Sequence, residues 1–316
     1  MPGKPCQPKN AAGHSGKKLQ AAIEYLMTYG WAILAVAVAL VVLFLTGALN
    51  PMTYESKAQP GSCFVTRPYG PNTTAYIYLA SGCKNQIPEF VAEFNGQGSY
   101  ITFAQPNTPT TSNASSAFAW VYITSEPPSS PCPCFYNILG IGEFTNYGMR
   151  ELAIGGMSST SASLYFGGDS DDYPSTLSVP LSSWHFVGYT YSSNTDGVTV
   201  YLDGQPQTGA LSGGVPLNTI NTNCAIIGAG ISASCQKTSF LAGSIANVQL
   251  YNTSLTPNEV KSLYLEGIGG APTDLQHLVG WWQLNGNPND SSGDGLNGTA
   301  NSVTYSSMWY TGYTAP

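Results

Sequence analysis

The carboxylate side chains that could act in catalysis are few and far apart in this sequence. Cleavage of a glycosidic bond needs two carboxyl groups that flank the bond. Glu89 and Glu93 are four residues apart, so they would share one face of a strand but reach a common bond poorly. Glu143 and Glu151 each stand without a second acid nearby in the sequence. No pair of carboxylates is therefore predicted to cleave a sugar.

Nucleophilic catalysis is no better supported. The sequence has three histidines, His14, His185 and His277. His185 lies inside an aromatic, strand-like segment, and the other two lie in segments without strand or helix patterning. Three scattered imidazoles do not argue for a Ser/His/Asp triad. We predict that the chain is not an enzyme.

Two aspartate-rich segments have spacings that calcium ligands can adopt. They are Asp169-Ser-Asp171-Asp172 and Asp290-Ser-Ser-Gly-Asp294-Gly. Neither matches a complete calcium-binding loop, and aspartate is also favoured in turns because it tolerates their backbone geometry. Two interpretations stay open: a calcium site that uses Asp290 and Asp294, or solvated turns, which we favour.

The cysteines favour an oxidising compartment. Seven are present, and six of them follow Cys6 at the N-terminal end. An even number on the outer side of a membrane is typical of disulfides. We predict the local pairs Cys63–Cys83 and Cys224–Cys235. The remaining two, in Cys132-Pro-Cys134, either close a strained disulfide with each other or stay as thiols.

Five Asn-X-Ser/Thr triplets also point to an extracellular surface, which glycosylation would modify. They begin at Asn72, Asn113, Asn252, Asn289 and Asn297.

Charge is scarce and lopsided. Charged residues make up 9% of the chain, against about 25% in ordinary soluble proteins. From residue 59 onward, five lysines and arginines face fifteen aspartates and glutamates. Nucleic-acid binding needs a basic surface, so this acidic region excludes it.

Residues 20–49 form one long apolar segment, which carries no charge after Glu24. A helix of this length would measure roughly 45 Å, which exceeds the ~30 Å hydrocarbon layer of a bilayer. Asn50-Pro51 would end it, because proline cannot continue a helix. We predict a transmembrane or filament-core helix over residues 20–50, after a basic leader over residues 1–19.

Glu24 is the anomaly of this helix, because a carboxylate in an apolar segment is costly unless it is paired. The stretch Lys17–Leu26, KKLQAAIEYL, resembles the class III signal sequence of archaeal type IV pilin-like proteins, and Tyr29–Leu34 extends the resemblance. It implies cleavage between Leu19 and Gln20 by a prepilin-type peptidase, which leaves Glu24 at the fifth mature position. There Glu24 can pair with the new α-amine of Gln20 as the helices self-assemble.

Beyond a linker at residues 51–61, short aromatic and β-branched runs separated by Ser, Thr, Asn, Gly and Pro predict strands nearly throughout. Val198–Gly204 alternates into Asp-Gly, a strong hairpin signal. One helix is predicted over Pro257–Glu266, with Thr256 as its N-cap and Glu259 completing a capping box. Many short strands with few helices indicate a β-sandwich.

Phe240–Gly267 resembles the last strand and closing helix of LamG-like jelly rolls of the concanavalin A-like superfamily. Other segments match the earlier strands of that family in order, namely Asn95–Phe103, Ala119–Tyr122, Trp184–Tyr189 and Val198–Gly204. The resemblance covers roughly residues 90–267 and implies a jelly roll in which Trp120, Trp184 and Tyr251 fill the core. The Glu-x-Asp-x-x-Glu triplet of retaining hydrolases on this fold is absent from the sequence.

The segment from Leu278 to Thr299 resembles the opening of such a domain, yet it follows the closing helix. We therefore predict a circularly permuted sandwich over residues 62–305, which residues 278–305 complete, and a tail over residues 306–316. Trp281, Trp282 and Leu284 are expected to return beside the strand Tyr100–Phe103.

Two hypotheses follow from these resemblances. In the first, the chain is a structural subunit of an archaeal type IV pilus-like surface filament, membrane-inserted as a precursor, with an outward lectin-like domain for adhesion to glycans or cell surfaces. In the second, it is a monomeric membrane-anchored protein that binds or, less favoured, processes extracellular glycans. A start of the mature chain at Gln20 supports the first hypothesis, and a start at Met1 supports the second.

Overall fold

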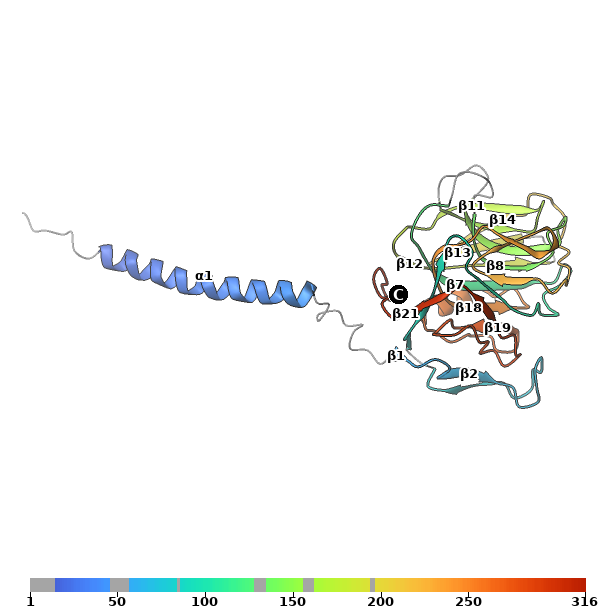
Figure 1. The fold of residues 1–316 in the computed structure, drawn as a ribbon, viewed down its shortest axis with the longest axis horizontal. Coiled ribbons are helices and arrows are strands. Elements are labelled where there is room, and N and C mark those ends of the chain that lie inside the picture. Colours follow the sequence, from blue (N-terminus) through green and yellow to red (C-terminus); the bar gives the residue numbers. More distant parts are fainter. Residues whose placement is uncertain (1–14, 46–56, 84–85, 128–134, 156–161, 194–196) are drawn as a thin grey trace, which may run out of the picture. The chain divides into compact units, whose positions relative to one another are not determined.

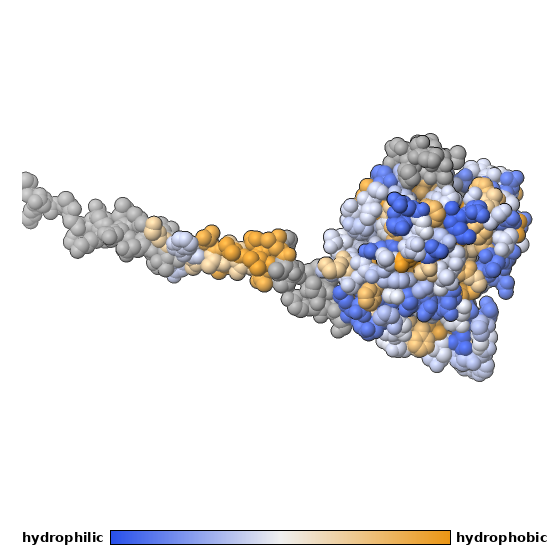
Figure 2. Space-filling view, in the orientation of Figure 1, coloured by the Kyte–Doolittle hydropathy of each residue, from blue (hydrophilic) through white to orange (hydrophobic). Residues whose placement is uncertain are grey.

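The computed structural model describes residues 15–45, 57–83, 86–127, 135–155, 162–193 and 197–316 (Figure 1). The chain divides into two units, Met1–Glu55 and Ser56–Pro316. In the first, α1 (Ser15–Leu45) contains most of the segment expected to be helical. Its described side chains are mostly apolar and are exposed, with Trp31 at 73% and Leu45 at 78% exposure. The face of this helix seen in Figure 2 is largely hydrophobic. By length and hydropathy together, no helix within the described residues qualifies as a membrane span.

The second unit is a β-sandwich, as predicted. In the described part of the chain, its two large sheets have seven and eight strands. The seven-stranded sheet runs in the order β11 (Asp172–Ser178), β10 (Ser163–Gly167), β9 (Met149–Gly155), β8 (Phe135–Gly142), β15 (Ala225–Ile227), β6 (Tyr100–Thr102) and β20 (Thr299–Asn301). The eight-stranded sheet runs in the order β14 (Gln205–Ala210), β13 (Gly197–Leu202), β12 (Trp184–Ser192), β7 (Ser115–Ile123), β18 (Ala242–Tyr251), β5 (Val91–Asn95) and β21 (Thr304–Ser306), while β19 (Leu278–Trp282) also pairs with β18.

Alternating side chains of both sheets meet in the core. On β9, Leu152 and Ile154 point inward, and on β7, Ala117, Ala119 and Val121 do so. Because successive side chains of a strand point to opposite faces, the residues between them must lie on the outer faces of the sheets. The two outer faces of the sandwich are covered very differently.

The outer face of the eight-stranded sheet is sealed by aromatic residues. The helix α2 (Pro257–Leu265) has the predicted capping box and lays Tyr264 on Trp120, with ring centroids 6.0 Å apart. Trp120, Trp184 and Tyr251 are buried, as expected, but under this cover rather than between the sheets.

The segment predicted to be a tail belongs to the same cover. Trp309 is 6% exposed and packs edge-on against Trp184, and its indole donates to the carbonyl of Pro88. Tyr313 lies edge-on against Trp120, with ring centroids 5.4 Å apart. The last residues of the chain are therefore part of the folded unit.

The segment after α2 enters both sheets. β20 pairs with β6, β21 pairs with β5, and β19 pairs with β18. The prediction that the two tryptophans would lie beside Tyr100–Phe103 is therefore wrong in part: β20 takes that place. Trp282 still packs on Phe103 across the core, with ring centroids 4.2 Å apart, whereas Trp281 points to the other face and donates to Asn247 Oδ1 at 2.7 Å.

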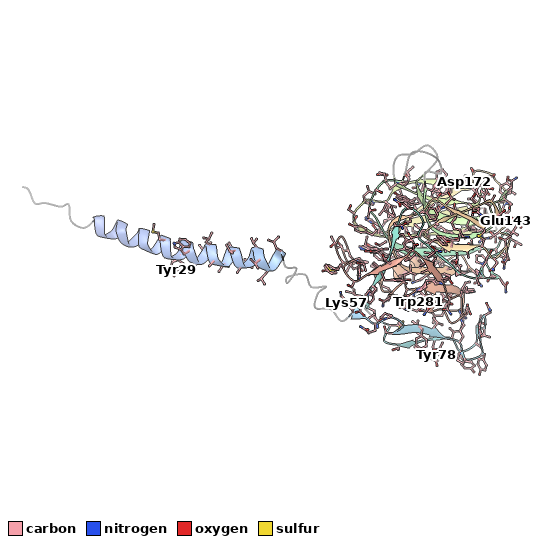
Figure 3. The ribbon with its side chains drawn as sticks, viewed as in Figure 1. Tyr29, Lys57, Tyr78, Glu143, Asp172 and Trp281 are labelled. Atoms are coloured by element: carbon pink, nitrogen blue, oxygen red, sulfur yellow. A yellow bond between two sulfur atoms is a disulfide. The ribbon has the colours of Figure 1, made fainter. Side chains whose placement is uncertain are left out.

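Within the described residues, three small ribbons complete the unit. They are β1 (Lys57–Ala58) with β4 (Ile87–Pro88), β2 (Cys63–Thr66) with β3 (Tyr78–Ser81), and β16 (Gly230–Ser232) with β17 (Gln236–Thr238), joined by the short 3-10 helix η2 (Ala233–Cys235). The β2–β3 hairpin docks through Arg67, which pairs with Asp294 at 3.0 Å and donates to the carbonyl of Ser292. Its outer surface carries Tyr78, which is 52% exposed (Figure 3).

Candidate functional site

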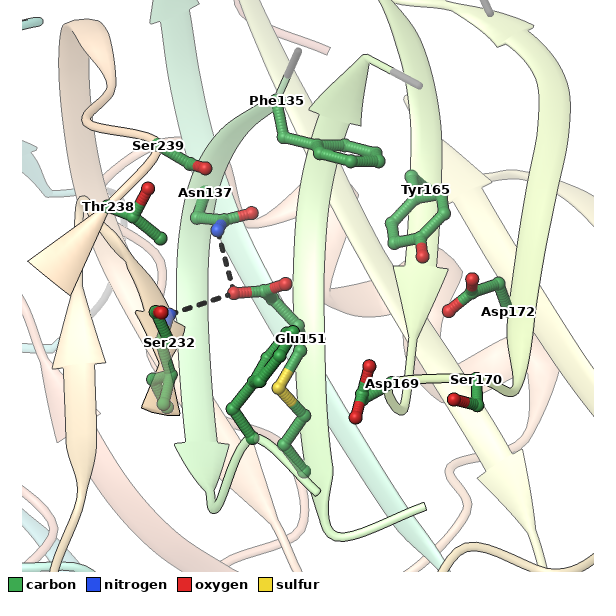
Figure 4. A pocket seen from close by; sticks show the side chains of 13 residues that line it. Phe135, Asn137, Glu151, Tyr165, Asp169, Ser170, Asp172, Ser232, Thr238 and Ser239 are labelled. Atoms are coloured by element: carbon green, nitrogen blue, oxygen red, sulfur yellow. Dashed lines mark hydrogen bonds between the residues drawn. The ribbon is translucent and has the colours of Figure 1, made fainter. Parts of the chain in front are cut away.

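A pocket of about 370 Å³ opens on the outer face of the seven-stranded sheet. Strands β8, β9, β10 and β11 form its floor and one side, and the β16–β17 ribbon forms the other (Figure 4). Its lining residues are Phe135, Asn137, Phe144, Met149, Glu151, Tyr165, Asp169, Ser170, Asp172, Ile231, Ser232, Thr238 and Ser239. The volume falls at the lower end of the ~300–1,000 Å³ range of ligand pockets, so it fits a small molecule or the end of a longer chain.

Glu151 lies on the floor of this pocket and is 7% exposed. One of its carboxylate oxygens, Oε1, accepts hydrogen bonds from Asn137 Nδ2 at 2.7 Å and from the amide of Ile231 at 3.3 Å. Figure 4 shows the other oxygen on the side of Tyr165. Burial raises the pKa of Glu151 to about 8, although the bond from the Ile231 amide opposes this shift. Glu151 can therefore hold a proton at neutral pH, and it can release that proton to solvent when a cation binds beside it.

Two aspartates and a tyrosine face Glu151 across the pocket. Tyr165 comes from β10, Asp169 from the β10–β11 turn and Asp172 from the start of β11. Burial, and next the negative charge of Asp172, raise the pKa of the Tyr165 hydroxyl well above its ordinary value, so it stays a donor. Burial and the charge of Asp172 also raise the pKa of Asp169.

The pocket contains polar atoms that the described residues leave without a partner. Asn137 is 2% exposed, and its Oδ1 atom has no hydrogen-bond partner among the described residues; neither does Asp172 Oδ1. Figure 4 shows the Asn137 oxygen turned into the pocket. Because buried polar atoms are nearly always hydrogen-bonded, these acceptors mark the places where a ligand would donate.

A disulfide holds the wall opposite these acids. Cys224–Cys235, one of the two predicted pairs, joins the end of η2 to the residue before β15. Ile231 of β16 packs beneath it with Met149 and Ile226 of the sheet. The second predicted pair, Cys63–Cys83, closes the β2–β3 hairpin. Cys132 and Cys134 lie outside the described residues.

The calcium hypothesis meets aspartates that already have partners. Asp290 accepts hydrogen bonds from the amides of Trp281, Ser292 and Leu296, at 2.8 to 3.0 Å. Asp294 pairs with Arg67 and accepts from the amide of Asn72. These contacts tie turns together, and the described residues contain no group of three or more His, Cys, Asp or Glu side chains that could hold a metal.

Ser183, His185 and Asp203 form a hydrogen-bonded chain that the sequence analysis did not foresee. His185 Nε2 lies 2.8 Å from the Ser183 hydroxyl, and its Nδ1 lies 2.7 Å from Asp203 Oδ2. This is the connectivity of a hydrolase triad. Asp203, however, lies at the β13–β14 turn and also accepts a hydrogen bond from the backbone amide of Phe186 in β12. The three hydrogen-bonded residues therefore fasten that turn to β12. It lies on the eight-stranded sheet, whereas the pocket lies on the other.

The remaining predicted sites fall into two groups: asparagines of the second unit, which the structure describes, and N-terminal side chains that it does not describe. Of the sequon asparagines, Asn72, Asn113, Asn289 and Asn297 are exposed, whereas Asn252 is half-buried. The side chains of Leu19, Gln20 and Glu24 lie outside the described part of α1.

Sequence reasoning missed the pocket because its residues come from six strands and the segments next to them. One signal was available: Arg150-Glu151 places two adjacent charges in the middle of an otherwise apolar strand. Charged side chains are rarely fully buried without a partner or a function, so this pair could have been predicted to have a binding or structural role.

A family comparison places this geometry in context. Residues 95–261, about half of the chain, match the model of the concanavalin A-like lectin/glucanases superfamily. The chain belongs to this superfamily. The matched region contains every residue that lines the pocket, whereas the β2–β3 hairpin and β19–β21 of this concanavalin A-like domain lie outside it.

Solved structures align with this chain at low sequence identity, and one of them shares its fold. A Bacteroides ovatus protein described as carbohydrate-binding aligns at 17% identity with a TM-score of 0.53, over 73% of this chain and 62% of its own. A SAP-like pentraxin from Limulus polyphemus aligns at 14% identity with a TM-score of 0.45, over 68% and 94% of the two chains. The CBM40 domain of the Ruminococcus gnavus IT-sialidase aligns at 14% identity with a TM-score of 0.40, over 56% and 100%. No curated protein matches the sequence.

Proposed function

We propose that the chain is a non-enzymatic subunit of an archaeal type IV pilus-like surface filament, and that its concanavalin A-like domain binds glycans in the pocket beside Glu151. The observation that carries the glycan-binding part is the pocket itself. It combines Phe135 and Tyr165, whose rings lie 4.6 Å apart, with polar atoms that lack partners in the described structure. Aromatic faces suit the apolar faces of sugar rings, and a few fixed polar groups orient the hydroxyls.

The fold supports the same proposal without deciding it. The Bacteroides ovatus protein that shares the fold is described as carbohydrate-binding. The two disulfides in the described chain suit an extracellular location, where surface glycans are available.

The filament part of the proposal rests on the N-terminal segment. The described side chains of α1 are mostly apolar and exposed, and such a helix needs lipid or other helices around it. A precursor held in the membrane and later packed in a helical bundle satisfies this need in turn. In the bundle, the α-amine of Gln20 would neutralise the charge of Glu24, after a prepilin-type peptidase has removed the leader.

Glycan binding is tested by applying the full chain to a glycan array. We expect selective binding that Glu151→Gln weakens. Glu93→Gln, an exposed glutamate on β5 outside the pocket, is the matched control and should bind as the unmodified chain does. An array without any bound glycan would contradict the proposal.

N-terminal sequencing of the mature protein tests the filament part separately. A start at Gln20 is expected, together with filaments that Glu24→Ala prevents. A start at Met1 would instead support a monomeric membrane-anchored glycan-binding protein.

A further inference from the structure

The pocket is rich in acids and its described lining has no basic residue. Between residues 135 and 178, which include the four strands of its floor and side, the sequence has five acidic residues and one basic residue, Arg150. Glu151, Asp169 and Asp172 line the pocket, and no lysine or arginine is among its described lining residues. The charges of Asp169 and Asp172, joined by that of Glu151 when it ionises, therefore meet a ligand without a cation among the described lining residues.

Arg150 does not offset these charges within the pocket, because it points to the opposite face of β9. Its guanidinium lies between the two sheets, donates to Thr219 Oγ1 at 2.8 Å and to Ser115, and lies 5.1 Å from the ring centroid of Tyr191. The nearest cation on the ribbon, Lys237 of β17, holds its ammonium 5.9 Å from the ring centroid of Tyr100.

The unpartnered atoms of the pocket are acceptors. Asn137 Oδ1 and Asp172 Oδ1 are buried without partners in the described structure, and Glu151 offers the carboxylate oxygen that neither Asn137 nor Ile231 binds. The acids do not form a cluster that could hold a metal ion within the described residues. An organic ligand that carries several donors and a positive charge would satisfy these acceptors.

We propose that this pocket takes a saccharide with a free amino group, bound as its ammonium, in preference to neutral and acidic sugars. This inference rests on the proposed glycan-binding function. An ammonium has three N–H donors and no acceptor, which matches the three acceptor groups. Charge-assisted hydrogen bonds are stronger than neutral ones, and the rings of Phe135 and Tyr165 add a favourable surface for a cation.

Binding of the ammonium is coupled to the proton on Glu151. The titratable groups that face Glu151 are Tyr165, Asp169 and Asp172, while β8, β16 and β17 line the pocket with neutral groups. With a pKa of about 8, Glu151 is largely protonated at pH 6.5 in the empty pocket. A cation beside it favours the ionised form, so binding at this pH should release up to about one proton.

The test is isothermal titration calorimetry on the full chain, in a detergent without a sugar headgroup. Three ligands are compared at pH 6.5: the disaccharide of glucosamine, its N-acetylated counterpart, and sialyllactose. We expect the amino sugar to bind roughly 10- to 100-fold more tightly than the acetylated one, as loss of a charged hydrogen bond implies, and sialyllactose to bind most weakly. Repeating the titration in buffers of different ionisation enthalpy should show proton release.

Variants locate the effect. Glu151→Gln and Asp172→Asn should each reduce the preference for the amino sugar at least about 10-fold, and Glu93→Gln should leave it unchanged. Thermal unfolding of each variant checks that the chain is folded.

Equal binding of acetylated and free amino sugars at the pocket would overturn this inference and leave glycan binding intact. Binding of Nα-acetyl-lysine amide as tight as that of the amino sugar would overturn the assignment to saccharides. Failure of every sugar to bind would overturn the proposed function as well.

Discussion

The two outer faces of the sandwich are built by the same strand alternation, and they differ in what covers them. Over the eight-stranded sheet, Trp120 and Trp184 lie under α2 and the C-terminal residues, and both are nearly inaccessible. Over the seven-stranded sheet, the β16–β17 ribbon covers only part of the face and leaves Glu151 and Tyr165 at a pocket.

The difference separates stability from recognition. A sealed aromatic face contributes free energy of folding, because large apolar surfaces leave water. An incompletely covered face with buried acids lowers the free energy of unfolding instead, since its carboxyl groups lose hydration and Asp172 Oδ1 has no donor among the described residues. Such a face is understandable where a ligand supplies what is missing.

The largest expected effect tests whether the sealed face depends on the C-terminal segment. A chain that ends at His277 loses β19–β21, with Trp281 and Trp282 at 1% and 0% exposure, and the covering Trp309. We expect this truncation to abolish cooperative unfolding, because truncation of one buried tryptophan already costs ~3–5 kcal/mol of a typical ~5–15 kcal/mol. Circular dichroism during heating measures it. A soluble truncated chain with a sharp melting transition would show that residues 278–316 are an appendage.

A single substitution on the sealed face should strongly lower stability without changing glycan binding. Trp120→Ala is expected to lower the free energy of unfolding by ~3–5 kcal/mol and to leave glycan affinity unchanged, because Trp120 and the pocket are on opposite sheets. Denaturant unfolding measures the free energy of unfolding, and calorimetry measures the glycan affinity. Tyr76→Ala, at a side chain that is 77% exposed, is the control and should change stability by less than about 0.5 kcal/mol. Weaker binding by folded Trp120→Ala would show that the faces are coupled.

On the face that carries the pocket, the free energy of unfolding should depend on pH through Glu151. The folded chain keeps the Glu151 proton up to about pH 8, whereas the unfolded chain releases it near 4.5, so the unfolded state binds fewer protons between these values. The free energy of unfolding should therefore fall as pH rises from about 5 to 8, by on the order of a few kcal/mol, and then level off.

Glu151→Gln should flatten this fall, since glutamine resembles the protonated acid and does not ionise. Urea unfolding at several pH values compares it with Glu93→Gln, which should keep the slope of the unmodified chain. An unchanged slope in Glu151→Gln would show that another group is responsible.

Sequence patterns predicted the parts of this fold that local rules determine. The capping box of α2, the Asp203-Gly204 hairpin turn and the two short-range disulfides each depend on residues close in the chain. The family resemblance supplied the sandwich. The sequence analysis placed Trp281 and Trp282 together beside Tyr100–Phe103, but β19 pairs with β18, because the choice of strand neighbour depends on partners far along the chain.

The pocket could not be predicted in the same way. Asn137, Glu151, Tyr165 and Asp172 come together only after β8, β9, β10 and β11 pair in register. The sequence also gave no reason to connect Ser183 and His185 with Asp203, since the turn at the end of β13 brings the aspartate back beside β12.

The smallest expected effect concerns these three residues. If the Ser183–His185–Asp203 chain is structural, Ser183→Ala should change the free energy of unfolding by about 1 kcal/mol or less. A fluorophosphonate probe should leave the unmodified protein unlabelled, as judged by mass spectrometry of the intact chain. Stoichiometric labelling that Ser183→Ala removes would instead assign a catalytic serine to the eight-stranded sheet. The sealed face would then have a function in addition to stability.

The docking of the β2–β3 hairpin has a mechanical consequence. Val65 of this hairpin donates its amide to the carbonyl of Ser291, Arg67 binds Ser292, and Asn285 donates to the carbonyl of Ala58. The first residues of the sandwich are thus fastened to the segment that supplies strands to both sheets. When the domain is pulled at residue 57, we expect these hydrogen bonds to pass part of the tension to the segment that supplies strands to both sheets. A domain that holds a surface against flow through a single N-terminal attachment would gain resistance to rupture from this arrangement.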